Sequence, residues 1–304
     1  MKALLTNIFR LRAFRRFCHG DEEMRFISLD QKPSWFNNAG SKNTFAKRGG
    51  RPQGIKEHFS QTRERYTILT SVPSWGHGDL NPPNVALLFR GKAKGTIWKK
   101  LQEHRINCMP WMKVQCQDCG SYRSDDVVEA LDWMLPNATK SSESVVVLLD
   151  WFAGHLTDAV AEKIRSKGHV LLLHGGGTTP FTQINDTHLH AQLAAHLVRL
   201  EVRWNADERQ RLMALKELFP QRSSTPSQNR YNILSLVQTV WLLLDHGRIA
   251  EKGYRQTGPT MPLEGPILHE DIYCNLLDVL CRIDGDKSGM EVSVSLREEA
   301  IKYA

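Results

Sequence analysis

The sequence predicts an α/β fold with a mixed sheet, and two observations predict it. Three β-prone runs, at residues 24–30, 65–72 and 85–90, fall within the first ninety residues, which is typical of an antiparallel meander. From about residue 112 onward, short apolar runs alternate with helical segments, which is typical of parallel strands joined by helices. The expected sheet therefore begins antiparallel, continues parallel and is flanked by helices.

The middle of the chain supplies the expected connecting elements. We expect a short helix at 96–104, a strand at 112–116 and a helix from Ser124 to about Leu135 that has acids in its first turn. The apolar run 145–149 reads as a buried strand, and Thr157 caps the helix that follows it. A strand at 169–173 and a helix at 186–202 complete the alternation.

The C-terminal third reads as helical. We expect helices at 205–219 and 231–245, separated by a Ser/Pro/Gln-rich linker at 222–229, and two further helical stretches in the tail. A basic helix is expected at 1–19. The sequence therefore divides into that helix, an α/β domain at 20–203 and a helical C-terminal extension at 204–304.

The composition is that of an ordinary globular protein. The chain has 304 residues, of which 41% are hydrophobic and 24% charged, so it can bury a substantial core. No run approaches the roughly 20 apolar residues that span a bilayer, and we expect no membrane partner. The six cysteines do not resemble the framework of a small secreted domain, which favours a reducing intracellular compartment.

Positive charge is concentrated in the first third of the chain. Residues 1–110 carry 20 Lys and Arg against 8 Asp and Glu, whereas 111–304 carry 20 against 25. Such a basic region favours a polyanion, nucleic acid ahead of acidic lipid, because Lys and Arg displace counterions from phosphates. Lys47, Arg48 and Arg51 lie in a basic Gly-containing loop and are candidate DNA contacts. The alternative for this loop is a solvated hairpin.

Three aspartates stand at the ends of predicted elements. Asp150 ends the run Val-Val-Val-Leu-Leu, Asp30 ends Met-Arg-Phe-Ile-Ser-Leu, and Asp186 stands just before a helical segment. A single Asp at such a position is most often a turn former or a cap. Three of them, each delivered by an ordered element, predict a metal site because carboxylates are ligands that hard divalent cations prefer.

The order of elements and acids is that of an RNase H-like fold. The motifs Val-Leu-Leu-Asp150-Trp-Phe-Ala-Gly-His155 and Thr178-Thr-Pro-Phe-Thr-Gln183-Ile-Asn-Asp186 resemble those of the DDE superfamily endonuclease domain of mariner, pogo and Tigger-like transposases. The 35 residues between Asp150 and Asp186 fit that family's spacing. Trp151 stands where the family usually has Asn, Ile184-Asn185 replace Pro-Leu, and the loop before the third motif reads His174-Gly-Gly-Gly.

The resemblance implies a DNA transposase-derived endonuclease that cleaves and joins phosphodiesters with two Mg²⁺ or Mn²⁺ ions. Asp30, Asp150 and Asp186 would be the catalytic metal ligands, with Asp30 bridging the ions. His155 and Gln183 would support these ligands or contact DNA. The resemblance further implies DNA as partner, a homodimer, a nuclear location and no small-molecule substrate.

The N-terminal region bears on what kind of protein this is. Family members carry helix-turn-helix modules before the first acid, whereas 29 residues precede Asp30, so we expect the N-terminal DNA-binding module to be missing. The alternatives to an enzyme are a catalytically inactive domesticated nucleic-acid-binding protein, and a fragment. The acid-free, Arg-rich residues 1–19 also resemble a mitochondrial presequence, which keeps that location open.

Three other motifs predict less. Cys116-Gln-Asp-Cys119 has the spacing of half a zinc site, without a second pair at a fitting distance. The run His174-Gly-Gly-Gly resembles an esterase oxyanion loop, but the sequence has no Gly-x-Ser-x-Gly nucleophile. Residues 284–289 copy the first half of an EF-hand loop, yet Ser295 stands where the bidentate Glu belongs.

Overall fold

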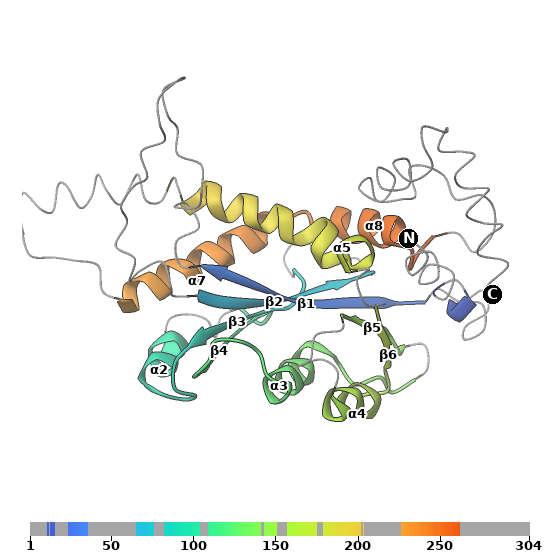
Figure 1. The fold of residues 1–304 in the computed structure, drawn as a ribbon, viewed down its shortest axis with the longest axis horizontal. Coiled ribbons are helices and arrows are strands. Elements are labelled where there is room, and N and C mark those ends of the chain that lie inside the picture. Colours follow the sequence, from blue (N-terminus) through green and yellow to red (C-terminus); the bar gives the residue numbers. More distant parts are fainter. Residues whose placement is uncertain are drawn as a thin grey trace, which may run out of the picture.

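A six-stranded mixed sheet forms the centre of the protein in this computed structural model (Figure 1). The strand order is β4-β3-β2-β1-β5-β6. The strands are β1 (Phe26–Trp35), β2 (Arg65–Pro73), β3 (Val85–Arg90), β4 (Met112–Gln117), β5 (Val146–Leu149) and β6 (Val170–Leu173). The structure describes residues 11, 13–15, 24–35, 65–75, 82–103, 109–140, 143–150, 157–174, 179–201, 203 and 226–261.

The pairing of the strands confirms the predicted mixed sheet. β1 pairs with β2, and β2 with β3, in antiparallel fashion. β5 pairs in parallel with both β1 and β6, and β4 pairs in parallel with β3. The antiparallel meander thus lies in the middle of the sheet, with parallel strands added on both sides.

The first strand runs further than predicted. The sequence analysis placed Asp30 at a strand end, but β1 continues to Trp35, with Gln31 opposite Leu69 on β2. The continuation was not predicted because the residues after Asp30 are polar and include Pro33, which is not typical of a strand. Pro33 is tolerated because β1 pairs with β2 alone at that point: its pairing with β5 stops at Ser28.

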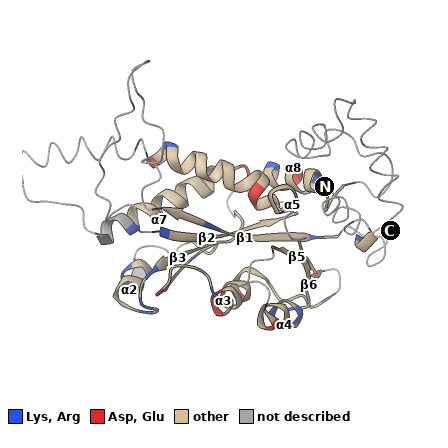
Figure 2. Cartoon of the chain, in the orientation of Figure 1, with Lys and Arg blue, Asp and Glu red and all other residues tan. Residues whose placement is uncertain are grey.

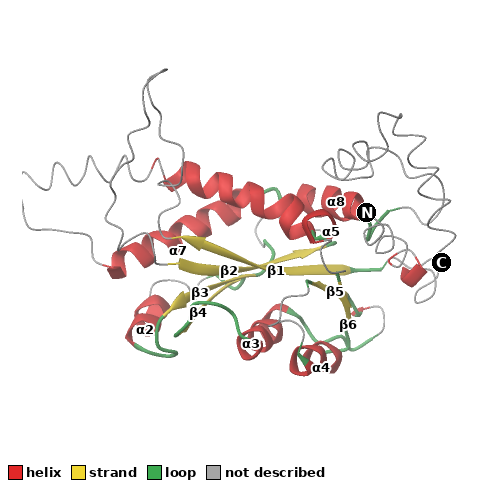
Figure 3. Ribbon diagram, viewed as in Figure 1, coloured by secondary structure: helices red, strands yellow, loops and turns green. Residues whose placement is uncertain are grey.

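Helices cover both faces of the sheet (Figures 1 and 3). On one face, called the α3/α4 face, lie two helices, and on the other, called the α7/α8 face, lie five helical segments. The former are α3 (Ser124–Met134) and α4 (Asp158–Ser166); the latter are α5 (Thr179–Thr182), η3 (Asn185–Leu189), the helix over 190–201, α7 (Pro226–Leu243) and α8 (His246–Thr257). The helix α2 (Thr96–Glu103) packs beside β4 at the sheet edge. Among the described residues, none of these helices is long and apolar enough to cross a membrane.

Helix α7 begins earlier than the sequence suggested. Residues 226–229 were expected to be linker, but α7 starts at Pro226. Proline is well suited to a first helical position because its missing N–H has no partner there in any case. Both α7 and α8 contribute buried side chains to the core on their face of the sheet, among them Trp241 and Tyr254. The expected helix at 205–219 lies outside the described residues.

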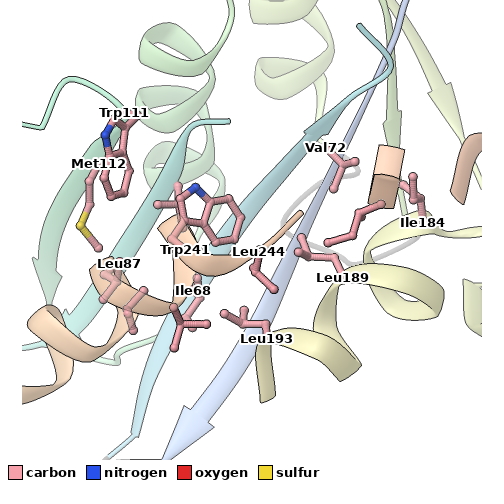
Figure 4. Close-up of a cluster of buried hydrophobic side chains, with 14 of the residues drawn as sticks. Ile68, Val72, Leu87, Trp111, Met112, Ile184, Leu189, Leu193, Trp241 and Leu244 are labelled. Atoms are coloured by element: carbon pink, nitrogen blue, oxygen red, sulfur yellow. The ribbon is translucent and has the colours of Figure 1, made fainter. Parts of the chain in front are cut away.

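Alternation along each strand creates two separate cores. Phe26, Tyr66 and Ile68 point to the α7/α8 face, whereas Ile27 and Leu69 point to the α3/α4 face. On the α7/α8 face, Trp241 of α7 is fully buried and its Nε1 donates to the Pro83 carbonyl oxygen at 2.7 Å. Figure 4 shows side chains of this core, contributed by strands and by helices far apart in the sequence: Ile68, Val72, Leu87, Trp111, Met112, Ile184, Leu189, Leu193, Trp241 and Leu244.

Candidate metal centre

Asp30 lies in the middle of the sheet on the α7/α8 face. It follows Phe26 and Ser28 at the two-residue period of β1, so its side chain belongs to the same face as theirs. Asp30 is only 6% exposed, and its neighbour across the antiparallel ladder is Thr70 of β2. One carboxylate oxygen, Oδ1, accepts a hydrogen bond from the Gln31 backbone N–H at 2.7 Å. A carboxylate is thus placed on a core face that is otherwise mostly apolar.

Asp150 reaches the same place from the neighbouring parallel strand. It follows Leu149, the last residue of β5, and the register pairs Ser28 with Leu148. The two-residue period puts Asp150 on the same face as Asp30, although the pairing of the two strands ends at Ser28 and Leu148 and the Asp150 carboxylate does not belong to the close group of ligand atoms described below. The charge of Asp150 accordingly raises the pKa of Asp30.

Asp186 completes the group from a π-helical turn. It is the second residue of η3, and its side chain is 41% exposed. The turn approaches α8 closely at Gly253: a Cβ there would lie 2.4 Å from both Cγ1 and Cδ1 of Ile184. Single π-turns are frequent at functional sites. Here the turn, supported by α8, brings Asp186 next to the central strand.

The electrostatics of Asp30 show the effect of this convergence. Its pKa is raised well above the usual value, first because burial penalises the charged form and then because Asp186 and Asp150 repel it. Burial lowers the pKa of Lys32, which lies two residues further along β1, while the charges of Asp186 and Asp30 act in the opposite direction. Lys32 is the cationic side chain of β1 that interacts with the acids.

Sequence analysis missed His190, which joins this group. Its Nδ1 lies 3.2 Å from Oδ1 of Asp186 and 3.4 Å from Oδ2 of Asp30. Its Nε2 lies 3.1 Å from the Thr70 hydroxyl, which also accepts a hydrogen bond from Asn185 Nδ2 at 2.8 Å. The available signal was the four-residue spacing from Asp186, which puts both side chains on one helical face. Burial lowers the pKa of His190, which favours the neutral imidazole.

His174 is a second histidine that sequence analysis assigned to no site. It follows Leu173, the last residue of β6, and its backbone N–H donates to the Leu149 carbonyl at 2.9 Å. It is 2% exposed, and burial lowers its pKa to about 4, although Asp150 and Asp186 pull in the other direction. Its position past β6 matches that of Asp150 past β5, which is the signal that could have found it.

The other predicted site residues are placed only in part. Gln183 is fully buried, and its side-chain amide lowers the pKa of Asp30, although within the described part of the chain neither polar atom makes a hydrogen bond of ordinary geometry. His155, Lys47, Arg48 and Arg51 lie outside the described residues. Their predicted roles stay predictions.

The donor atoms fit a divalent cation. One ligand atom each from Asp30, Asp186 and His190 lie within 4.8 Å of one another, and no other such trio exists among the described residues. Cys116 and Cys119 are both free cysteines, and the EF-hand-like loop lies outside the described ranges. Oxygen-rich, negatively charged donor sets are those that Mg²⁺ and Mn²⁺ take.

Comparisons with known proteins agree with this architecture. No protein-family model matches the chain, and no curated protein matches it in sequence. Among solved structures, the Mos1 mariner paired end complex matches in its Mn and Mg forms, each with a TM-score of 0.50 over 85% of this chain, at 12% and 13% identity respectively. The Mos1 transposase paired-end complex with left transposon end matches at a TM-score of 0.46 and 13% identity over 84% of this chain.

The similarity defines the class of fold. The chain has an RNase H-like fold, a mixed six-stranded sheet flanked by helices, as predicted. More particularly, it shares the fold of the Mos1 mariner complexes, which confirms at the level of fold the resemblance to a mariner-like DDE endonuclease domain. The chain spans 59–60% of the length of the first of these solved chains.

Proposed function

We propose that this chain is the catalytic domain of a transposase-derived endonuclease that cleaves and joins DNA phosphodiesters at Asp30, Asp150 and Asp186. The observation that carries the proposal is the acidic surroundings of the buried Asp30: Asp186 lies within metal-ligand distance of it, and its pKa is raised first by burial and then by the charges of Asp186 and Asp150. Like charges gathered in a buried place are unfavourable by themselves. They become favourable when a divalent cation stands between them.

The proposed division of work follows from position. Asp30, on the central strand, is the shared ligand, and Asp150 and Asp186 approach it from β5 and η3. Two bound Mg²⁺ or Mn²⁺ ions would lower the pKa of an attacking hydroxyl and stabilise the leaving oxygen. Burial and the hydrogen bond from the Gln31 backbone N–H hold the carboxylate of Asp30 in place, whereas the exposed Asp186 would leave the site open toward a substrate.

Positive charge beside the acids and at the β4 edge of the sheet supports a polyanionic substrate. Lys32 lies on β1, two residues from Asp30, and interacts electrostatically with Asp30 and Asp186. A second group of exposed lysines lies in and just before α2, at the β4 edge (Figure 2): Lys92, Lys94, Lys99 and Lys100. Since Lys neutralises phosphate and releases counterions, these positions suit a nucleic-acid backbone. DNA as the partner, a homodimer and a nuclear location belong to the proposal.

The proposal is tested by nicking of supercoiled plasmid DNA with Mg²⁺ or Mn²⁺. Wild type should nick only when metal is present, and Asp30→Asn, Asp150→Asn and Asp186→Asn should each lose more than the ~10–100-fold that removal of an outer ligand-orienting partner costs. Asp118→Asn, at an exposed turn after β4, is the matched control and should behave as wild type.

Two results would contradict the proposal. Equal residual cleavage by all five proteins would mean that the three aspartates do not act in the reaction. Absence of metal-dependent cleavage, together with steeply salt-dependent DNA binding that the Asp→Asn changes leave intact, would instead support the non-catalytic DNA-binding alternative.

A further inference from the structure

His190 occupies the position of a metal ligand rather than that of an ordinary core histidine. It is 4% exposed and lies on the first turn after η3, four residues from Asp186. Its Nδ1 faces two carboxylate oxygens at once: Oδ1 of Asp186 at 3.2 Å and Oδ2 of Asp30 at 3.4 Å. Neighbouring ligands on an octahedral ion at about 2.1 Å are separated by about 3 Å. His190 Nδ1 has nearly that spacing from each of the two oxygens, and the ligand atoms of the three residues all lie within 4.8 Å of one another.

The surroundings of His190 fix its ring with Nδ1 toward the acids. The opposite nitrogen, Nε2, lies 3.1 Å from the Thr70 hydroxyl, and that hydroxyl lies 3.2 Å from the Asp30 carbonyl oxygen. Nε2–H can donate to Thr70 while Thr70 donates to Asp30, and the Asn185 amide then donates to the same hydroxyl at 2.8 Å. Each proton in this series of hydrogen bonds has one acceptor. The Nδ1 lone pair is left pointing at two carboxylates, an arrangement that a cation stabilises.

Among the described residues, some buried polar atoms of the cluster make no hydrogen bond of ordinary geometry. Gln183 is fully buried, and its amide interacts with Asp30 and lowers its pKa, but neither the amide nitrogen nor the amide oxygen has such a hydrogen bond within the described part of the chain. The Nε2 of the buried His174, which interacts with Asp150 and Asp186, also lacks a partner among the described residues. Buried polar groups are ordinarily satisfied, and groups that are not call for water or an ion.

We propose that His190 Nδ1 is a direct ligand of the divalent cation held by Asp30 and Asp186, and that this nitrogen makes the site select Mn²⁺ over Mg²⁺. The inference rests on the proposed function, since it presumes that the aspartates hold a metal. Carboxylate sites suit Mg²⁺ and Mn²⁺ alike, whereas imidazole suits transition metals and not Mg²⁺. Thr70 acts as the positioning residue that holds the ring, as outer partners of metal-bound histidines do.

The direct test is pulsed electron paramagnetic resonance of bound Mn²⁺, which detects a coordinated imidazole nitrogen. Wild type should give a nitrogen modulation that changes when histidine is labelled with ¹⁵N, and His190→Gln should lose it. The matched control is His188→Gln, because His188 is buried nearby but its Nε2 interacts with Gln256 of α8 instead. That variant should keep the signal. Circular dichroism of each variant verifies that it is folded.

A second measurement is calorimetric titration with Mn²⁺ and with Mg²⁺. His190→Gln should weaken Mn²⁺ binding at least ~10-fold and Mg²⁺ binding much less, so that the ratio of the two dissociation constants moves toward one.

Two results would contradict these proposals. If the resonance spectrum of wild type shows Mn²⁺ bound at the aspartates without a histidine nitrogen, the inference is overturned and His190 is a hydrogen-bond donor to Asp186. Mn²⁺ affinity that Asp30→Asn leaves unchanged would overturn the proposed function itself.

Discussion

Two buried charged side chains, on opposite faces of the sheet, have opposite kinds of neighbours. Lys167 ends α4 on the α3/α4 face, and its ammonium donates to the carbonyl oxygens of Asp132 and Leu135 at 2.9 and 2.8 Å. The Asp132 carboxylate lies 3.3 Å away. Asp30, on the α7/α8 face, is as buried as Lys167 but has two carboxylates for neighbours.

The difference separates a structural charge from a functional one. The Lys167 ammonium donates hydrogen bonds to several oxygens. Two of them are carbonyls at the C-terminal end of α3, where a cation is favoured. The pKa of Asp30 is raised by burial and by Asp186 and Asp150, and the hydrogen bond from Gln31 and the Gln183 amide offset this only in part, with Lys32 as the cationic side chain of β1 nearby. A buried charge without compensation is unfavourable unless a ligand supplies it. On the proposed function, a bound cation would supply the compensation that Asp30 lacks, whereas Lys167 has it from its own fold.

The largest loss of folding stability is expected when Lys167, the hydrogen-bonded buried charge, is replaced. Replacing Lys167 with Met keeps much of the side-chain volume but leaves the carbonyls of Asp132 and Leu135 without their donor. Leaving a buried acceptor without its donor destabilises by about 1–3 kcal/mol for each group. Urea unfolding should show that loss, while Mn²⁺ affinity of the folded protein stays at the wild-type value. A loss below ~1 kcal/mol would remove the contrast between the two faces.

Substitution of Asp30 should instead raise the stability of the metal-free protein. In metal-free protein its folded pKa is raised above the unfolded one, so the folded state holds the proton more tightly. The stability that this provides is fully present below the unfolded pKa of about 4 and is lost as pH rises through the folded pKa. Asp30→Asn should flatten this loss and make the protein more stable than wild type at neutral pH in EDTA. A destabilised Asp30→Asn protein under those conditions would contradict the account.

His174 should give a loss of stability in acid. Its pKa of about 4 lies below the ordinary value near 6.5, so the unfolded chain takes up the proton first as pH falls. Stability that is present above pH 6.5 is lost as pH falls toward 4, by about 3 kcal/mol. His174→Gln should remove that part of the acid loss in a urea series across these pH values. Parallel pH profiles for the two proteins would show that His174 is not neutral in the fold.

Features that depend on a local run of residues could be predicted from the sequence, whereas features that depend on tertiary contacts could not. Asp30, Asp150 and Asp186 could be singled out because each follows a recognisable run of residues, and the alternation of strands and helices predicted the sheet. His190 was not found, because its approach to Asp30 depends on how η3 packs on β1, which is a tertiary contact. The extension of β1 to Trp35 was missed because its support comes from β2, not from its own polar sequence.

A smaller effect is expected where α8 supports the π-turn. In Gly253→Ala the new Cβ would lie 2.4 Å from Ile184, so the turn or the helix must shift, at a cost of about 1–3 kcal/mol. Because Asp186 is two residues from Ile184, metal affinity should fall with stability. Gly247→Ala on the same helix is the control, since its Cβ would meet only Asp245 Oδ1, at 3.8 Å. Equal stability and equal metal affinity of the two variants would mean that the packing of α8 does not support the metal centre.

The most direct measurement of the central claim is anomalous X-ray diffraction from crystals of the protein soaked in Mn²⁺. The account predicts an anomalous peak between the carboxylates of Asp30, Asp150 and Asp186, with His190 Nδ1 within coordination distance. Asp30→Asn crystals treated in the same way should lose that peak. A wild-type crystal with Mn²⁺ bound elsewhere and no peak among the three carboxylates would contradict the account.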